Sequence, residues 1–250
     1  MTGWLQAGGW GLLGGAALVL GATVAWFLRV PPRVVAAVMA FGAGVLISAL
    51  SIDLMQEAAD RGGVGAAALG FLGGAVAYVC ANALLARRGA RHRKRSGSQQ
   101  PSESEQAGSG AAIAVGALLD GVPESVVLGT SLVGGHGVGL SVLAAVFISN
   151  VPEGLSSVAG MKQAGRSARY VFGVWGGIAV ASGLAGLLGA LLLQGAPVQT
   201  IALITAVAAG AILAMIADTM IPEAFADAHL FAGLVTVAGF LCAFAVSHVG

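Results

Sequence analysis

The sequence predicts an all-α membrane protein that crosses a bilayer eight times. Of its 250 residues, 57% are hydrophobic and only 9% are charged, and the mean hydropathy is +0.90. A soluble domain carries about 25% charged residues. Several apolar runs also exceed the roughly 20 residues that a helix needs to cross the hydrocarbon core. The net charge of +1 gives no reason to expect a nucleic-acid partner, whereas the lipid bilayer is an expected one.

Glycine, proline and charged residues divide the chain into eight predicted spans. These are residues 8–28, 34–59, 64–86, 111–133, 139–163, 169–194, 198–221 and 228–249. No Lys or Arg precedes the first apolar run, so it lacks the basic region of a signal peptide and is interpreted as a retained span. We therefore expect residues 1–250 to form a single transmembrane domain.

The basic residues predict the orientation of the spans. Eleven of the twelve fall at the odd-numbered connections, and only Arg61 falls at an even-numbered one. Short loops rich in Lys and Arg stay in the cytoplasm. We therefore expect a multi-pass protein of the cell membrane (inner or plasma membrane) with its N- and C-termini outside.

The third connection, residues 87–110, is the only low-complexity segment. Six basic residues come first, and a stretch rich in Ser, Gln and Gly follows. This composition predicts a disordered cytoplasmic loop whose basic part lies on anionic lipid. A regulatory role for the loop is left open.

Two spans share a sequence pattern. Residues 43–58 read AGVLISALSIDLMQEA, and residues 209–224 read AGAILAMIADTMIPEA. The predicted topology makes these two spans run in opposite directions. Matched spans of opposite direction are typical of the inverted repeats from which many secondary transporters are built.

Three carboxylates fall near the middle of predicted spans: Asp120, Glu124 and Glu153. Each costs about 2.5–3.5 kcal/mol at that depth, and the predicted spans place no Lys or Arg at similar depth to pair with them. Asp120 and Glu124 are four residues apart and share one helix face. The pattern favours a bound cation, and protonated structural acids are the alternative.

A proline precedes each of the two mid-span glutamates. Pro123 cannot donate to the carbonyl of Leu119, and Pro152 cannot donate to that of Ile148. A carbonyl freed at membrane depth must find another partner. We expect these oxygens to face a cation or water beside the carboxylates.

These motifs resemble those of the ZIP divalent-metal transporters. DGVPES at 120–125 matches part of the family's fourth-span motif, and NVPEG at 150–154 matches the fifth. The endings of spans 2 and 7, and SGLAGLLGALL at 182–192, resemble the corresponding spans. The resemblance implies eight spans, an inverted repeat and metal transport into the cytoplasm. It also assigns residues to the metal site (Asp120, Glu124, Ser149, Asn150 and Glu153) and to the ion pathway (Asp53, Glu57, Asp218 and Glu223).

Three positions depart from the family pattern. Its fourth-span histidine is Asp120 here, the following asparagine is Gly121, and a sixth-span glutamate corresponds to Gly186. Carboxylates suit harder ions than imidazole does, so we expect weak discrimination of zinc from manganese or iron. With these ligands missing, the resemblance implies a single metal ion per chain.

The expected function is therefore uptake of a divalent transition metal, with zinc as the first candidate and iron, manganese and cobalt as alternatives. The ion is cargo, and neither a catalytic cofactor nor enzymatic activity is expected. The alternative is a proton-coupled carrier of another solute that uses the same carboxylates as a relay. An intramembrane aspartyl hydrolase would need two aspartates at depth, and only Asp120 qualifies. A homodimer remains open.

Overall fold

The structure, a computed structural model, describes residues 3–133 and 140–249. Within this range there is no strand, and eight helices are long and apolar enough to cross a membrane. The predicted all-α polytopic architecture is thus confirmed. The eight long helices are α1 Gly3–Phe27, α2 Pro32–Ala49, α4 Val64–Leu85, α5 Ser109–Val133, α6 Leu140–Gln163, α7 Ala168–Leu192, α8 Val198–Met215 and α10 Phe231–Val249.

Short helical segments extend three of these spans beyond the predicted ends. The second span continues through the π-helix η1 (Leu50–Leu54) into α3 (Met55–Gly62), and the seventh continues through η3 (Ile216–Met220) into α9 (Ile221–Ala228). The third span ends in another π-helix, η2 (Ala86–Ala90). There Gly89 has φ of 101°, which favours glycine and ends the helix.

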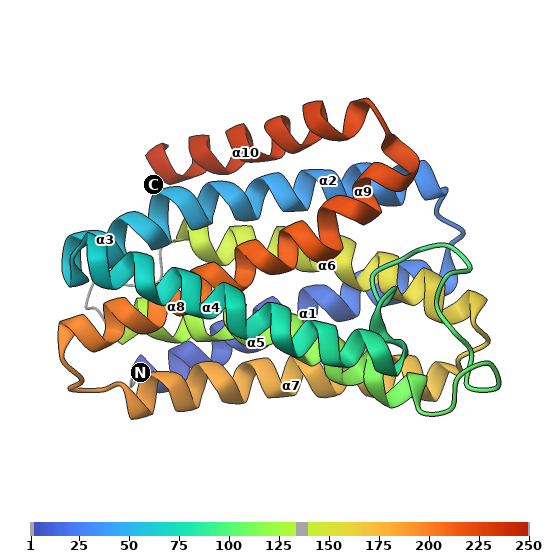
Figure 1. Cartoon of the computed structure of the whole chain (residues 1–250), viewed down its shortest axis with the longest axis horizontal. Coiled ribbons are helices and arrows are strands. Elements are labelled where there is room, and N and C mark those ends of the chain that lie inside the picture. Colours follow the sequence, from blue (N-terminus) through green and yellow to red (C-terminus); the bar gives the residue numbers. More distant parts are fainter. Residues whose placement is uncertain (1–2, 134–139, 250) are drawn as a thin grey trace.

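The connections that the structure describes lie at the two ends of the bundle (Figure 1). Both termini share an end with the turns at 62–63 and 193–197. The opposite end holds the connections at 28–31, 91–108, 164–167 and 229–230. The odd-numbered connections, which carry most of the basic residues, are therefore together. The Gly134–Gly137 connection, with His136, lies outside the described residues.

Glycines let neighbouring helices touch through their backbones. On α2, Gly44 lies against the carbonyl of Thr236 of α10, and Gly239 of α10 lies against the carbonyl of Phe41. A Cβ at either glycine would overlap that carbonyl. Small residues at such crossings allow the close packing on which helix association in membranes depends.

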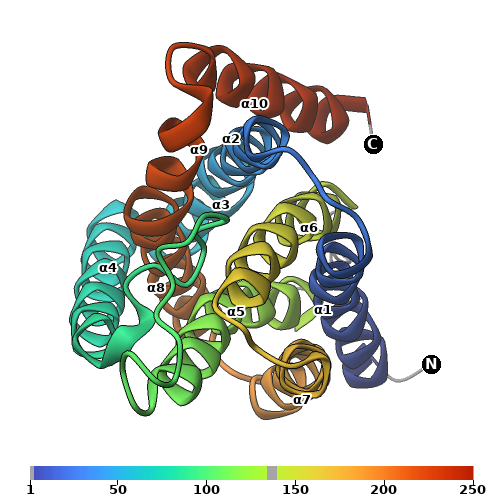
Figure 2. The same ribbon diagram turned by 90° about the vertical axis from the view of Figure 1, so that its right-hand side faces the viewer.

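The centre of the bundle is formed by α5 and α6. Figure 2 views the bundle from one end and shows these two helices between α1 and α7 on one side and α2, α8 and α9 on the other. Helix α1 packs on both α6 and α7, and α4 packs on α8. Helix α10 contacts mainly α2 and is the least buried span. Side chains that point inward from α5 and α6 are consequently far from lipid.

Candidate cation site among the buried carboxylates

All five residues predicted for the metal site are buried on the two central helices. Asp120 and Glu124 lie on α5, and Ser149, Asn150 and Glu153 lie on α6, each no more than 3% exposed. Both helices continue through their internal prolines. The Ser149 hydroxyl donates to the carbonyl of Val146 at 3.0 Å, which turns it toward its own helix. The other four side chains supply the polar surface of the site.

The expectation that these carboxylates lack basic partners is wrong. Arg93 and Lys94, in the connection between η2 and α5, are 1% and 5% exposed and reach into the bundle. The connection folds back between the helices, so its basic residues do not all lie at the membrane surface. The predicted depth of each basic residue rests on its distance to the end of a span. That inference fails for a connection that folds back into the bundle.

Arg93 binds Asp120 through two parallel hydrogen bonds. Its Nε donates to Oδ2 at 2.8 Å, and its Nη2 donates to Oδ1 at 2.7 Å. Tyr78 of α4 donates its hydroxyl proton to the same Oδ1 at 2.6 Å, and Arg93 Nη1 donates to Asn82 Oδ1 at 2.7 Å. Bidentate pairs of arginine and carboxylate are strong and fix the relative orientation of the two side chains. Asp120 is therefore fully engaged by protein groups.

Lys94 is held in a different way. Its Nζ lies 2.7 Å from Glu153 Oε2 and 3.4 Å from Asp120 Oδ2. Among the described residues, the ammonium makes no aligned hydrogen bond. The ammonium of Lys94 is therefore held by electrostatic attraction to two carboxylates, one on α5 and one on α6.

Several oxygens of the site residues have no hydrogen-bond partner within the described part of the chain. They are Glu124 Oε1, Glu153 Oε1 and Asn150 Oδ1. Glu124 is near enough to interact electrostatically with Glu153 and Lys94, and Asn150 directs its amide nitrogen to the carbonyl of Gly14 at 2.9 Å. A buried acceptor without a partner costs about 1–3 kcal/mol. The centre of the bundle thus holds acceptor oxygens available to a further donor or cation.

The predicted set of three carboxylates is divided in this arrangement. Across residues 3–133 and 140–249, no group of three or more His, Cys, Asp or Glu side chains is placed to hold a metal ion. Arg93 binds Asp120, whereas Glu124 and Glu153 keep oxygens without a hydrogen-bond partner. A metal ion would need the basic side chains to leave before all three carboxylates could reach it.

The predicted pathway residues fall in different environments. Glu57 forms an ion pair with Arg61 at 3.0 Å near the end that holds the termini. At the opposite end, Asp218 is exposed and accepts a hydrogen bond from Asn82 at 3.2 Å. Glu223 is 2% exposed and accepts from the backbone N–H of Ser96 at 2.8 Å. Asp53 is half-buried in η1.

Of the two glycines at positions where the resemblance expects ligands, only Gly186 is required by packing. A Cβ at Gly186 would lie 2.7 Å from the carbonyl oxygen of Ala7 in α1, so no side chain fits there. A Cβ at Gly121 would be in ordinary contact, 3.7 Å from Ile178 Cγ2. Neither glycine offers a side-chain ligand, and the single ion per chain stays a prediction.

Sequence reasoning missed the partners of the carboxylates, which are Tyr78, Asn82, Arg93, Lys94 and Ser156. It also missed Gln100, which donates to backbone carbonyls of the connection and of α6. Charge balance was the available signal. The sequence has three mid-span carboxylates without basic partners in the spans. It also has six basic residues at positions 87–95, in the connection that leads into α5. Burial of part of that basic run satisfies both groups at once.

The outer part of the same connection is anchored at the surface. Arg166 donates to Glu103 at 2.6 Å, and the backbone N–H groups of Gly108 and Gly110 donate to the same carboxylate. These hydrogen bonds, that from Arg166 first, lower the pKa of Glu103 to about 2. Glu103 is therefore ionised at neutral pH and links residues 101–110 to the start of α7.

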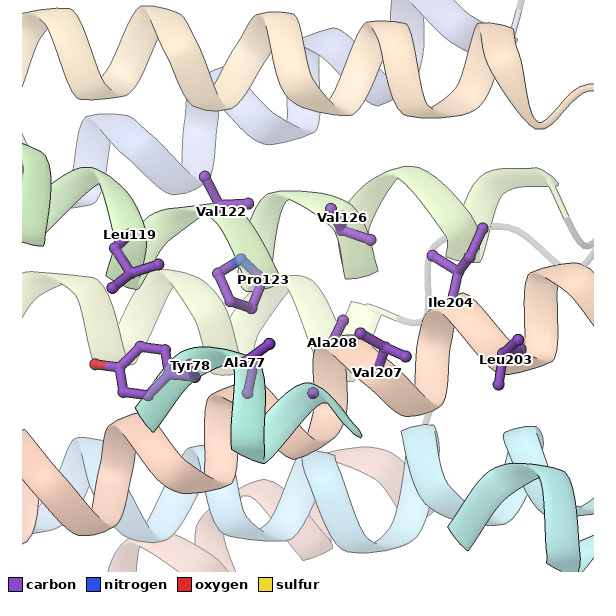
Figure 3. Close-up of a pocket in the computed structure, with 12 residues that line it drawn as sticks. Ala77, Tyr78, Leu119, Val122, Pro123, Val126, Leu203, Ile204, Val207 and Ala208 are labelled. Carbon is purple, nitrogen blue, oxygen red and sulfur yellow. The ribbon is translucent and has the colours of Figure 1, made fainter. Parts of the chain in front are cut away.

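A separate apolar pocket of about 400 Å³ lies between α4, α5 and α8. Figure 3 shows its lining of apolar side chains from these helices, with Pro123 in the middle and Tyr78 at one end. The Tyr78 hydroxyl points away from the apolar residues, toward its contact with Asp120. No charged residue lines this pocket, so it is not the polar site.

Comparison with family models and with curated proteins gives no match. The likeness to the ZIP transporters therefore rests on the quoted motifs alone. The eight apolar helices indicate a membrane transporter in general terms.

Proposed function

We propose that this protein carries a divalent transition-metal cation across the membrane, with zinc as the first candidate and iron, manganese and cobalt as alternatives. The main support is the set of unpartnered oxygens on Glu124, Glu153 and Asn150 at the centre of the bundle. Carboxylate and amide oxygens suit divalent cations, especially the harder ones. Asp120 joins them as a ligand when Arg93 leaves it.

The motifs quoted for the ZIP resemblance support the same substrate class. The cation moves between the two sides as one part of the bundle shifts against another, the usual behaviour of transporters built from inverted repeats. The ligating carboxylates must be deprotonated to bind metal, so metal affinity falls at acid pH. The basic residues at the odd-numbered connections support a cytoplasmic position for that end, and with that orientation the ZIP resemblance implies transport into the cytoplasm.

Uptake into proteoliposomes tests the proposal. Radioactive zinc, manganese, iron and cobalt are offered to wild type and to Glu124→Gln and Glu153→Gln, which keep side-chain size and remove the charge. We expect each variant to lose at least about 100-fold of uptake, with Glu105→Gln, an exposed residue of the loop, as the matched control. Uptake at the wild-type level in either site variant, at equal protein content, would refute the assignment.

The proton-coupled carrier remains the second candidate. The contact of Lys94 with Glu153 and Asp120 favours it, because a chain of titratable groups is what a proton relay requires. It predicts proton flux in vesicles from which metal has been removed with a chelator. Metal-dependent flux alone would reject it.

Orientation is tested by labelling. In a Cys80→Ala, Cys242→Ala background, a cysteine at Ser98 is expected to be shielded from a membrane-impermeant thiol reagent in intact cells, and one at Gly135 to react. Ser98 is exposed in the structure, so its shielding would come from the membrane and not from burial. The reverse pattern would overturn the inward direction.

A further inference from the structure

Residues 93–100, hereafter the plug segment, are docked between the helices that carry the site. Gln163 of α6 donates to the carbonyl of Ser96 at 2.9 Å, and Ser156 contacts both the carbonyl of Lys94 and the carboxylate of Glu223. Gln100 lies within hydrogen-bond distance of the Ser157 carbonyl, at 2.9 Å. Figure 2 shows this connection passing beside α9, α6 and α5. The segment is therefore held by several polar contacts to one face of α6.

Two glycines on the central helices make room for it. A Cβ at Gly116 of α5 would lie 2.6 Å from Arg93 Cδ. A Cβ at Gly160 of α6 would overlap the carbonyl oxygen of Arg95 and the amide of Gln100. A glycine inside a helix costs about 0.5–1 kcal/mol relative to alanine. At these two positions the segment can lie against the helices because glycine has no side chain.

The segment brings a positive charge to the open carboxylate. Lys94 Nζ lies at ion-pair distance from both Glu153 and Asp120. Arg93, with its aligned hydrogen bonds to Asp120, fixes the backbone beside it. Lys94 thus fills, with one charge, the place where a substrate cation would meet carboxylates from both helices.

A polar cavity of about 240 Å³ opens beside the segment at the basic end of the bundle. Lys94 and Arg95 form part of its wall, together with Asp218 and Thr219 of η3. Neither Glu124 nor Glu153 lines this cavity, whereas Lys94 lines it and also contacts Glu153. The segment therefore separates this cavity from the site.

We propose that the plug segment is an internal competitor of the transported cation. Its Lys94 ammonium occupies the cation position, and substrate binds all the carboxylates only when the segment withdraws. The nature of the displaced substrate rests on the proposed function. Because only the withdrawn state binds, the apparent dissociation constant exceeds the intrinsic one by the inverse of the withdrawn fraction.

The test measures equilibrium binding of Zn²⁺ and Mn²⁺ to the purified full chain. Lys94→Met removes the ammonium, and Lys162→Met, the other lysine of the chain, is its control. Gly160→Leu displaces the segment without changing any charge, and Gly173→Leu, whose Cβ has nothing within 4 Å, is its control. We expect both test variants to tighten the apparent Kd at least about 10-fold and both controls to leave it unchanged.

Thiol labelling reports the position of the segment independently. In a Cys80→Ala, Cys242→Ala background, a cysteine replacing the buried Ser96 is expected to react slowly, and at least about 10-fold faster when Gly160→Leu or saturating Zn²⁺ is present. Equal labelling in all three cases would overturn the docked plug.

The outcomes separate the two proposals. Equal metal affinity in wild type, Lys94→Met and Gly160→Leu would overturn the plug while the proposed metal transport stands. Tighter binding in Lys94→Met alone would also overturn it, since charge removal without displacement would then explain the gain. Absence of metal binding in all variants, including Gly160→Leu, would overturn the proposed function and the competition with it.

Discussion

The second and seventh spans have the same succession of helical segments, but their ends have different surroundings. Each consists of an 18-residue α-helix, a five-residue π-helix and an eight-residue α-helix, which are α2, η1 and α3 in one case and α8, η3 and α9 in the other. The two run in opposite directions through the bundle (Figure 1). Their shared sequence pattern therefore corresponds to a shared structure.

The Ala-Gly pair of the pattern has the same task in both spans. Gly44 of α2 lies against the backbone of α10 at Thr236, and Gly210 of α8 lies against the backbone of α4 at Phe71. Each partner helix returns the contact through a glycine of its own, Gly239 or Gly74. The two spans are thus alike in their glycine-mediated helix contacts as well as in their sequences.

The glutamates that end the pattern differ. Glu57 is partly exposed and is paired with Arg61 of its own helix. Glu223 is buried and accepts from the backbone of Ser96, from the hydroxyl of Ser156 at 3.0 Å and from Arg95 at 3.4 Å. The repeat sets the backbone of both spans, whereas only Glu223 is covered by residues of the third connection, Arg95 and Ser96.

The largest expected effect is the loss of stability when the glycine contacts that the two spans share are blocked. Gly44→Leu and Gly210→Leu each force a side chain into a partner backbone that cannot rotate away. We expect both to lower the free energy of unfolding by about 3 kcal/mol or more, at the top of the usual range for overpacking. The check is thermal unfolding in detergent with Gly73→Leu, whose Cβ meets nothing within 4 Å, as control. If only one variant is destabilised, the two crossings are not equivalent.

A smaller effect separates the two glutamates. Glu223→Gln removes a buried charge that accepts hydrogen bonds from Ser96 and Ser156. Such bonds contribute about 1.5–3 kcal/mol, and we expect a loss in that range. Glu57→Gln should change stability by less than about 1 kcal/mol, as for other surface pairs. Equal losses on thermal unfolding would show that the covering segment adds nothing at Glu223.

Span number, the repeat and the burial of the carboxylates could be predicted from sequence because each leaves a local pattern. Apolar length predicts a span, and the matched Ala-Gly and Glu-Ala positions predict the repeat. The partners of Asp120 and Glu153 could not be predicted in this way. Arg93 and Lys94 belong to a segment whose composition favours disorder, and their burial depends on glycines at 116 and 160 that only the packed helices reveal.

The smallest expected effect concerns the pair between Glu57 and Arg61. The two side chains are four residues apart on α3, at 3.0 Å, and are 35% and 23% exposed. Pairs of this kind contribute about 0.3–0.5 kcal/mol. A double-mutant cycle with Glu57→Gln and Arg61→Gln should therefore give a coupling of that size, and it should shrink between low and high salt because ions screen exposed charges. The matching cycle with Glu223→Gln and Arg95→Gln should be less sensitive to salt, since Glu223 is buried. Equal salt dependence in both cycles would mean that Glu223 is as open to solvent as Glu57, and the contrast between the two span ends would then fail.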